Sequence, residues 1–178
     1  MAARNRLPPW HEEIRIADGR ELLIRPVRPD DALPLRAGFA LMEPRGLRNR
    51  IEGDGALSQA AAEQLTRPDP RREFTLIASE RLPAGEAVIG AFARIVVVDE
   101  PANVGEMEIV VARFVAGMGL GRHLMRRMVR WGRGKKLDRL VGEVTADNLP
   151  MLALAKSLDF DEQPSSLPGF VTVVLALK

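Results

Sequence analysis

The chain has 178 residues, of which 46% are hydrophobic and 28% are charged, and its formal net charge is only +2. This length fits one compact domain, and the apolar fraction is high enough for a core, which excludes a mainly disordered chain. The chain has no cysteine, which excludes disulfides, thiolate zinc sites and a cysteine nucleophile. The small charge surplus is not a nucleic-acid signature.

No apolar run approaches the ~20 residues that cross a bilayer, and the first residues lack the apolar region of a signal peptide. A cytoplasmic protein with no membrane and no nucleic-acid partner is therefore expected. We expect a single domain over residues 1–178, in which residues 1–12 form a flexible N-terminal extension.

Strand-like and helix-like segments are interleaved along the chain. The expected strands are 21–27, 74–79, 88–98, 106–112, 140–145 and 170–177. The expected helices are 29–42, 57–65, a segment that follows a glycine-rich turn and ends near 132, and 149–158. This order predicts an α/β (α+β) domain whose mixed central sheet carries helices on both faces, with parallel pairing near the C-terminus.

The most informative segment is the glycine-rich turn, which has glycines at 117, 119 and 121 between a strand and a helix. Glycine lets the backbone turn tightly and approach a ligand with no Cβ in the way. The unpaired N–H groups of the first helical turn then point at one place, together with the positive end of the helix dipole. Such a turn is an anion cradle, and a pyrophosphate is its natural ligand.

Three other interpretations of the turn compete with this one. A phosphate-binding loop of NTPases needs Lys and then Ser or Thr after its last glycine, whereas Gly121 is followed by Arg122 and His123. A dinucleotide fingerprint needs a glycine where Arg122 stands, although Glu143 would mimic its ribose-binding acid. The third interpretation is a turn that merely packs closely.

The helix after the turn is amphipathic. Leu120, Leu124, Met128 and Trp131 recur at the spacing of a core-facing stripe. The arginines at 122, 126, 130 and 133 lie away from that stripe, which is typical of a solvated face. Those nearest the turn, above all Arg122, are candidates for binding a ligand's phosphates.

Two carboxylates precede the turn in the same expected strand. Glu106 and Glu108 point to one face because side chains alternate along a strand. A carboxylate in a partly dry cleft is suited to removing a proton from an amine. The plain alternative is that both are solvated strand residues.

Several segments resemble the GNAT superfamily of N-acetyltransferases. Residues 116–121 (AGMGLG) are similar to its acyl-CoA-binding motif, Q/R-x-x-G-x-G/A, and residues 141–160 resemble its strand and helix with a closing Leu-Gly-Phe. Residues 24–31 (IRPVRPDD) resemble its first strand and helix start, so the likeness spans 21–177. Within the family, the segments 105–111, 148–155 and 168–173 are most similar to the catalytic domain of Pat-type bacterial protein lysine acetyltransferases.

The resemblance implies a GNAT fold with a mixed sheet of six to seven strands. It also implies transfer of an acetyl or other short acyl group from acetyl-CoA, or another acyl-CoA, to a primary amine without a metal. Glu106 matches the catalytic glutamate of the Pat-type motif, and Glu108 is the reserve candidate. The residues that match cofactor-binding positions are Ile109, Val111, Gly117, Met118, Gly119, Leu120, Gly121, Arg122 and Asn148.

Some of these matches concern the backbone rather than the side chain. By the resemblance, Ile109 and Val111 act through their N–H groups on the acyl carbonyl and the pantetheine arm. Asn148 would hydrogen-bond the cofactor arm, cap the following helix, or do both. The acceptor would lie near the loops expected at 43–55 and 161–169, which do not distinguish a protein lysine from a small amine.

Three residues depart from the family pattern. Ala116 replaces the usual Gln or Arg, Asp159 replaces the glycine of Leu-Gly-Phe, and Ala155 stands where many members carry a tyrosine that protonates the leaving thiolate. The chain has no tyrosine, so CoA would leave as a thiolate or take its proton from solvent. Ala116 and the missing tyrosine favour a second hypothesis, a catalytically weak GNAT-fold module that binds acyl-CoA, whereas Glu106 argues against it. A homodimer is left open.

Overall fold

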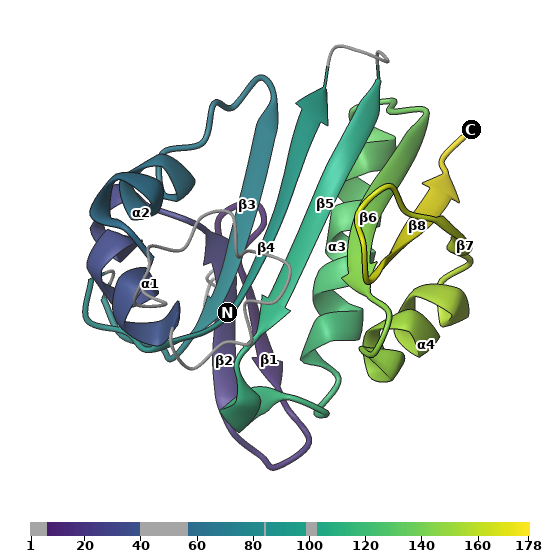
Figure 1. Cartoon of the computed structure of the whole chain (residues 1–178). Coiled ribbons are helices and arrows are strands. Elements are labelled where there is room, and N and C mark those ends of the chain that lie inside the picture. Colours follow the sequence, from purple (N-terminus) through teal and green to yellow (C-terminus); the bar gives the residue numbers. More distant parts are fainter. Residues whose placement is uncertain (1–6, 40–56, 84, 99–102) are drawn as a thin grey trace, which may run out of the picture.

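The computed structural model describes residues 7–39, 57–83, 85–98 and 103–178. Figure 1 shows one central sheet with helices on both sides of it. In chain order the elements are β1 (Glu12–Arg15), β2 (Glu21–Pro26), the 3-10 helix η1 (Pro29–Asp31), α1 (Ala32–Phe39), α2 (Gln59–Leu65), β3 (Glu73–Ser79), β4 (Ile89–Val98), β5 (Val104–Val111), the 3-10 helix η3 (Arg113–Val115), α3 (Leu120–Gly134), β6 (Arg139–Thr145), α4 (Leu149–Ser157), β7 (Asp161–Pro164) and β8 (Phe170–Ala176).

The strands of the described residues form one eight-stranded sheet in the order β1-β2-β3-β4-β5-β6-β8-β7. Every neighbouring pair is antiparallel except β5 and β6. The expected mixed sheet is therefore confirmed, including the parallel pairing near the C-terminus, with one strand more than the range of six to seven.

The sequence does not predict β1 or β7. Each has only four residues, EEIR and DEQP, and each forms an outer edge of the sheet. Short polar edge strands lack the alternating apolar pattern of a half-buried strand, although a polar edge protects a sheet from pairing with other chains. The sequence predicts a loop over 161–169. This prediction is wrong for the first four residues, because they pair with β8.

The helices begin where local capping allows. The helix expected over 29–42 starts as η1 and continues as α1, and residues 40–42 lie outside the described part. The helix expected from residue 57 begins at Gln59, because the side chain of Ser58 accepts a hydrogen bond from the Ala61 N–H at 3.0 Å. In the described part of the chain, no helix has the length and apolar character needed to span a membrane.

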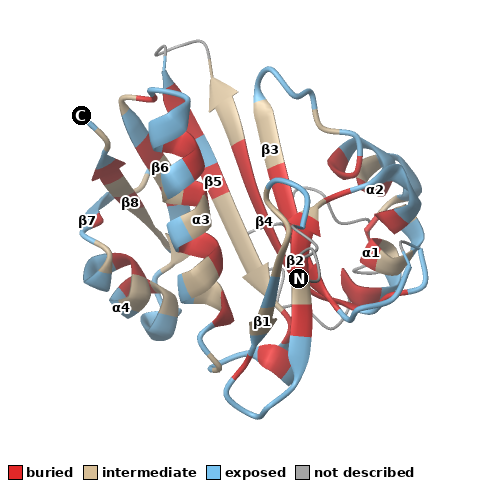
Figure 2. Ribbon diagram, turned by 180° about the vertical axis from the view of Figure 1, so that it is seen from behind, coloured by how far each residue is buried: buried red, intermediate tan, exposed pale blue. Residues whose placement is uncertain are grey.

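The two faces of the sheet differ in chemistry. A Cβ on Gly121 of α3 would lie 3.9 Å from Val111, so the odd-numbered residues of β5 face α3. Glu106 and Glu108 alternate with them and point to the opposite face, which we call the carboxylate face. Figure 2 shows α3 lying over β5 on the first face, and Figure 1 shows the carboxylate face toward the viewer.

The core beneath α3 follows the predicted stripe. Leu120, Leu124, Met128 and Trp131 are all buried, and the four arginines of the opposite face are exposed. Trp131 stacks on Phe74 of β3 with 5.0 Å between ring centroids, and Trp10 meets Phe74 edge-on at 4.8 Å. Trp10 belongs to the extension expected over 1–12, and this part of it is packed on the domain, because its indole meets Phe74. Residues 1–6 lie outside the described part.

Candidate active site

The site begins where the parallel strands β5 and β6 stop pairing. Their register runs from Val104↔Arg139 to Met107↔Gly142, yet β5 continues to Val111 and β6 to Thr145. A pocket of about 350 Å³ opens at this divergence. It is lined by Met107, Glu108, Ile109, Val110, Met125, Gly142, Glu143, Val144, Thr145, Asp147, Asn148, Pro150, Met151 and Val173.

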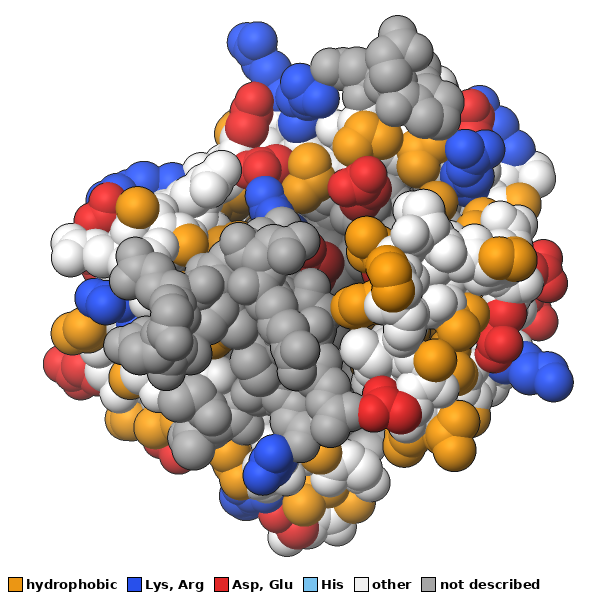
Figure 3. Space-filling view, viewed as in Figure 1, with side chains coloured by type: hydrophobic (Ala, Val, Ile, Leu, Met, Phe, Trp, Pro, Cys, Tyr) orange, Lys and Arg blue, Asp and Glu red, His pale blue; other side chains and the backbone are white. Residues whose placement is uncertain are grey.

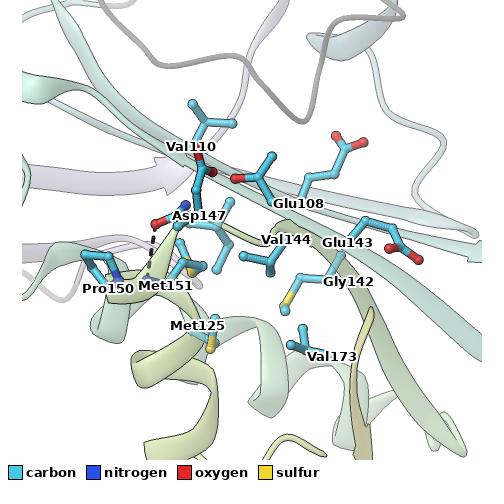
Figure 4. A pocket seen from close by; sticks show the side chains of 14 residues that line it. Glu108, Val110, Met125, Gly142, Glu143, Val144, Asp147, Pro150, Met151 and Val173 are labelled. Atoms are coloured by element: carbon cyan, nitrogen blue, oxygen red, sulfur yellow. Dashed lines mark hydrogen bonds between the residues drawn. The ribbon is translucent and has the colours of Figure 1, made fainter. Parts of the chain in front are cut away.

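The pocket has an apolar side and a carboxylate side. Ile109, Met125 and Met151 lie toward α3 and α4, where they pack against the core. In Figure 4 the carboxylates of Glu108 and Glu143 lie away from Met125 and Val173. Figure 3 shows the carboxylate face, with acidic side chains around a hollow near its centre. The pocket therefore suits an apolar group on one side and a positively charged group on the other.

The glycine turn has the backbone that its sequence predicts. Gly117 has φ +74° and Gly119 has φ +88°, both in the left-handed region that side chains disfavour. A Cβ at either position would have no neighbour within 4 Å, so conformation rather than crowding by protein atoms requires glycine there. Gly119 is the N-cap of α3, and the N–H groups of the first helical turn follow it. The result is a strand-to-helix turn with open space above it, as an anion cradle needs.

Three further predicted cofactor residues surround this turn. Leu120 is only 1% exposed, so it offers a ligand its backbone and not its side chain. Met118 is half-buried, and its sulfur lies 3.8 Å from the Arg20 guanidinium. The guanidinium of Arg122 donates to the Ser157 hydroxyl at 3.0 Å, which ties the start of α3 to the end of α4.

Asn148 caps the following helix, which is the simpler of its two predicted roles. Its side-chain oxygen accepts a hydrogen bond from the Met151 N–H at 3.3 Å and caps α4. The same residue also lines the pocket. Its amide nitrogen is a donor, so capping does not consume the group that would bind a cofactor.

The two candidate bases occupy different surroundings. Glu106 is exposed and lies between Val96 of β4 and Val141 of β6 in the register, and it is not among the residues that line the pocket. Glu108 lines the pocket and stands opposite Arg94. The guanidinium of Arg94 is itself paired with Glu73 at 2.6 Å. The structure thus brings Glu108, Ile109 and Asn148 into one pocket, with Val111 and the glycine turn beyond its apolar side.

Sequence reasoning gave no firm role to Glu143, which the structure places in the pocket wall. Its two carboxylate oxygens accept hydrogen bonds from Ser165 at 2.7 Å and Thr172 at 2.8 Å. The sequence gave little sign of these hydrogen bonds, because neither Ser165 nor Thr172 is near Glu143 along the chain. Within the described residues there is no group of three His, Asp or Glu that could hold a metal ion.

Asp159, which replaces the glycine of the family pattern, keeps the backbone conformation of a glycine. It has φ +68°, the left-handed conformation in which glycine ends many helices. Asp tolerates this conformation better than most residues. The helix end of the family motif is therefore retained here with a different residue.

Several solved structures share this fold. The GNAT domain of S. lividans PAT matches with a TM-score of 0.77 and 20% identity, over 97% of this chain and 100% of that one. The ribosomal-protein-S18-alanine N-acetyltransferase from Escherichia coli matches with a TM-score of 0.63 and 18% identity, over 88% and 92%. A cAMP-binding acyltransferase from Mycobacterium smegmatis matches with a TM-score of 0.63 and 20% identity, over 94% of this chain and 47% of that one.

The sequence itself gives the family. The model of the acetyltransferase (GNAT) family matches residues 48–160. The chain belongs to the GNAT acetyltransferase family, and the expected fold is confirmed. The three solved structures are 18–20% identical to this chain and show its fold alone.

Proposed function

We propose that this protein transfers an acetyl or other short acyl group from acyl-CoA to a primary amine. The observation that carries the proposal is the divergence of β5 from β6, which opens a pocket with an apolar side toward the glycine turn and carboxylates on the other side. Membership of the GNAT family supports it. The likeness to Pat-type enzymes makes a protein lysine one acceptor, and a small amine is the other.

Acyl-CoA would enter as a co-substrate along the apolar side. Its pyrophosphate would lie on the backbone from Gly117 to Arg122, where the glycine conformations leave open space. Its pantetheine arm would follow the edge of β5 beyond Met107, which β6 no longer pairs, and bond to the N–H groups of Ile109 and Val111. The amide nitrogen of Asn148 would donate to the same arm.

The reaction is a direct attack on the thioester. An alkylammonium has a pKa near ~10.4, so a base must take a proton before the nitrogen can attack. Glu106 takes that proton, and the neutral nitrogen forms a bond to the acyl carbon. A backbone N–H of β5 stabilises the oxyanion that develops. The carbon–sulfur bond then breaks, CoA leaves as a thiolate that solvent protonates, and the amide nitrogen loses its second proton.

A second candidate is a module that binds acyl-CoA with little turnover. Ala155, where many family members carry a tyrosine, is fully buried and has no group that could protonate a thiolate. Ala116 also lacks the side chain usual at the start of the glycine motif. Under this hypothesis acyl-CoA binds with ordinary affinity, but no amine is acylated at a useful rate.

One experiment separates the two. Acetyl-CoA is first titrated into the protein by calorimetry, and acyl transfer is then measured with mixed small amines and lysine peptides. Binding followed by amine-dependent release of free CoA is the expected result. Binding without release for any amine would support the binding module, and the absence of binding would contradict both candidates.

A further inference from the structure

The carboxylate of Glu143 has no role in the chemistry proposed above, yet the fold holds it in place. It lies on β6, and its oxygens accept hydrogen bonds from Thr172 of β8 and from Ser165 in the β7–β8 connection. Both donors are neutral hydroxyls, and within the described residues Glu143 makes no ion pair. A carboxylate has about four lone-pair positions, so two donors leave capacity for a further cation.

Register places this carboxylate beside the candidate base. Glu106 stands next to Val141 across the parallel pair, and Glu143 lies two residues further along β6 on the same face. The step is about 7 Å along the strand and about 5 Å across it, which gives a Cα separation of roughly 9 Å. Glu106 itself lies one pair before the last paired residues, Met107↔Gly142, and Glu143 lines the pocket that opens just beyond them.

We propose that Glu143 is a specificity-determining residue that binds a second positive charge of the acceptor. The inference rests on the proposed acyl transfer to an amine at Glu106. The acceptor is then an amine with another cation a few bonds from the reacting nitrogen. A small diamine and a peptide lysine with a basic neighbour share this chemistry. Thr172 and Ser165 act as positioning residues, because they fix the carboxylate without touching the acceptor.

The test compares matched acceptors in a measurement that needs no turnover. Cadaverine and pentylamine differ only in the second amino group, and each is titrated by calorimetry into the protein with free CoA present. We expect cadaverine to bind about three- to tenfold more tightly, a modest preference because Glu143 is exposed to solvent. The preference should shrink at high salt. A lysine peptide with an arginine neighbour, against one with glutamine there, tells a peptide acceptor from a small diamine.

Variants assign the preference to Glu143. Glu143→Gln should abolish it, and Thr172→Val, which leaves the carboxylate in place but loosens it, should reduce it. The matched control is Glu162→Gln, because Glu162 is exposed on neighbouring β7, stands opposite buried Val173, and so points to the other face. It removes the same charge and should leave the preference intact.

The outcomes distinguish this inference from the proposed function. Equal affinity of the wild type for both amines, or a preference that survives Glu143→Gln, would overturn the role of Glu143 even if acyl transfer is found. A preference that depends on Glu143 in a protein that acylates no amine would show that Glu143 binds a cation, but it would refute the proposed reaction and with it the role of Glu143 in selecting an acceptor. Equal losses in Glu143→Gln and Glu162→Gln would also overturn it, because general charge would then explain the preference.

Discussion

The two flanks of β5 are paired differently. Toward β4, pairing continues along the whole strand, from Val104↔Val98 to Val111↔Ala91. Toward β6, it ends at Met107, halfway along. The residues of β4 on the first flank are buried for most of their length, whereas those of β6 beyond Gly142 line a pocket.

The difference shows how one strand serves both stability and binding. Backbone N–H and C=O groups need partners, and β4 supplies them on one side throughout. On the other side no strand of the described residues pairs with the second half of β5, so a ligand can take the place of a strand there. The acyl-CoA binding that we propose depends on the unpaired half, and the candidate base Glu106 lies just before it, whereas the fold depends on the pairing with β4. Substitutions on the two flanks should therefore have separable effects.

The largest effect is expected at Glu106, one residue before the pairing of β5 with β6 ends. Glu106→Gln keeps the size of the side chain but removes the base, so kcat should fall by about 10²–10⁴-fold while acyl-CoA affinity changes little. The rising limb of the wild-type pH–rate profile should disappear in the variant. Glu108→Gln is the matched comparison and should lose much less. If the two variants behave the other way round, the resemblance is out of register by two residues, and if neither loses activity, a water relay to Glu143 becomes the next hypothesis.

The part of the sheet on the β4 side of β5 should respond in stability instead. Arg25 of β2 and Asp31 of η1 form a bidentate ion pair with both distances 2.8 Å, and the two side chains are 3% and 1% exposed. Asp31→Asn leaves the guanidinium buried without its counter-charge, so the free energy of unfolding should fall by about 3–5 kcal/mol. Urea denaturation measures this loss. Asp30→Asn, one residue away and exposed, should cost under about 0.5 kcal/mol. Equal costs for the two would contradict a structural role of the pair.

These elements show what the sequence could predict. The buried stripe of α3, the cap at Asn148 and the left-handed glycines at 117 and 119 all follow from local patterns, because each depends on residues within a turn or two. The divergence of β5 from β6 does not, because register between strands separated by a helix leaves no mark in either strand. The hydrogen bonds from Thr172 and Ser165 to Glu143 could not be predicted either, because they too depend on how distant segments pair.

Gly105 lies close to the point where β5 and β6 stop pairing, and a larger residue should be poorly tolerated there. A Cβ on Gly105 would lie 2.8 Å from Leu140, 2.9 Å from Leu137 and 3.0 Å from Ile95. Gly105→Ala therefore overpacks the base of the divergence, and we expect a loss of about 1–3 kcal/mol in thermal or urea unfolding. Gly134→Ala, at a helical position with no neighbour within 4 Å, should be neutral or slightly stabilising. If Gly105→Ala is as well tolerated, the junction is more plastic than its contacts indicate.

A side chain at Gly119 should weaken acyl-CoA binding, because it disfavours the backbone conformation of the glycine turn. Because Gly119 has φ +88° and open space around its Cβ position, Gly119→Val is strained by about 1–2 kcal/mol without a clash with protein atoms. Acyl-CoA affinity should therefore fall by about five- to thirtyfold in calorimetry. Gly19→Val carries the same strain at φ +90° in the turn between β1 and β2, and should cost stability without weakening acyl-CoA binding. Tighter binding of NADH than of CoA would refute the assignment of the turn.

The smallest effect concerns the tie between edge strand β1 and α3. The Glu12 carboxylate contacts both Arg127 and the His123 ring, the latter at 2.9 Å. Burial raises the pKa of Glu12, but the hydrogen bond and charge of His123 and the charge of Arg127 outweigh it, and the pKa is lowered below 4.5. A carboxyl with a lowered folded-state pKa contributes stability above its unfolded pKa and loses that contribution as the pH falls through the folded value. Wild type should exceed Glu12→Gln in free energy of unfolding by under about 1 kcal/mol at neutral pH, because the carboxylate is partly exposed. The difference should vanish in acid, and a difference that stays constant down to pH values well below about 4 would show that the contact is not an ionic one.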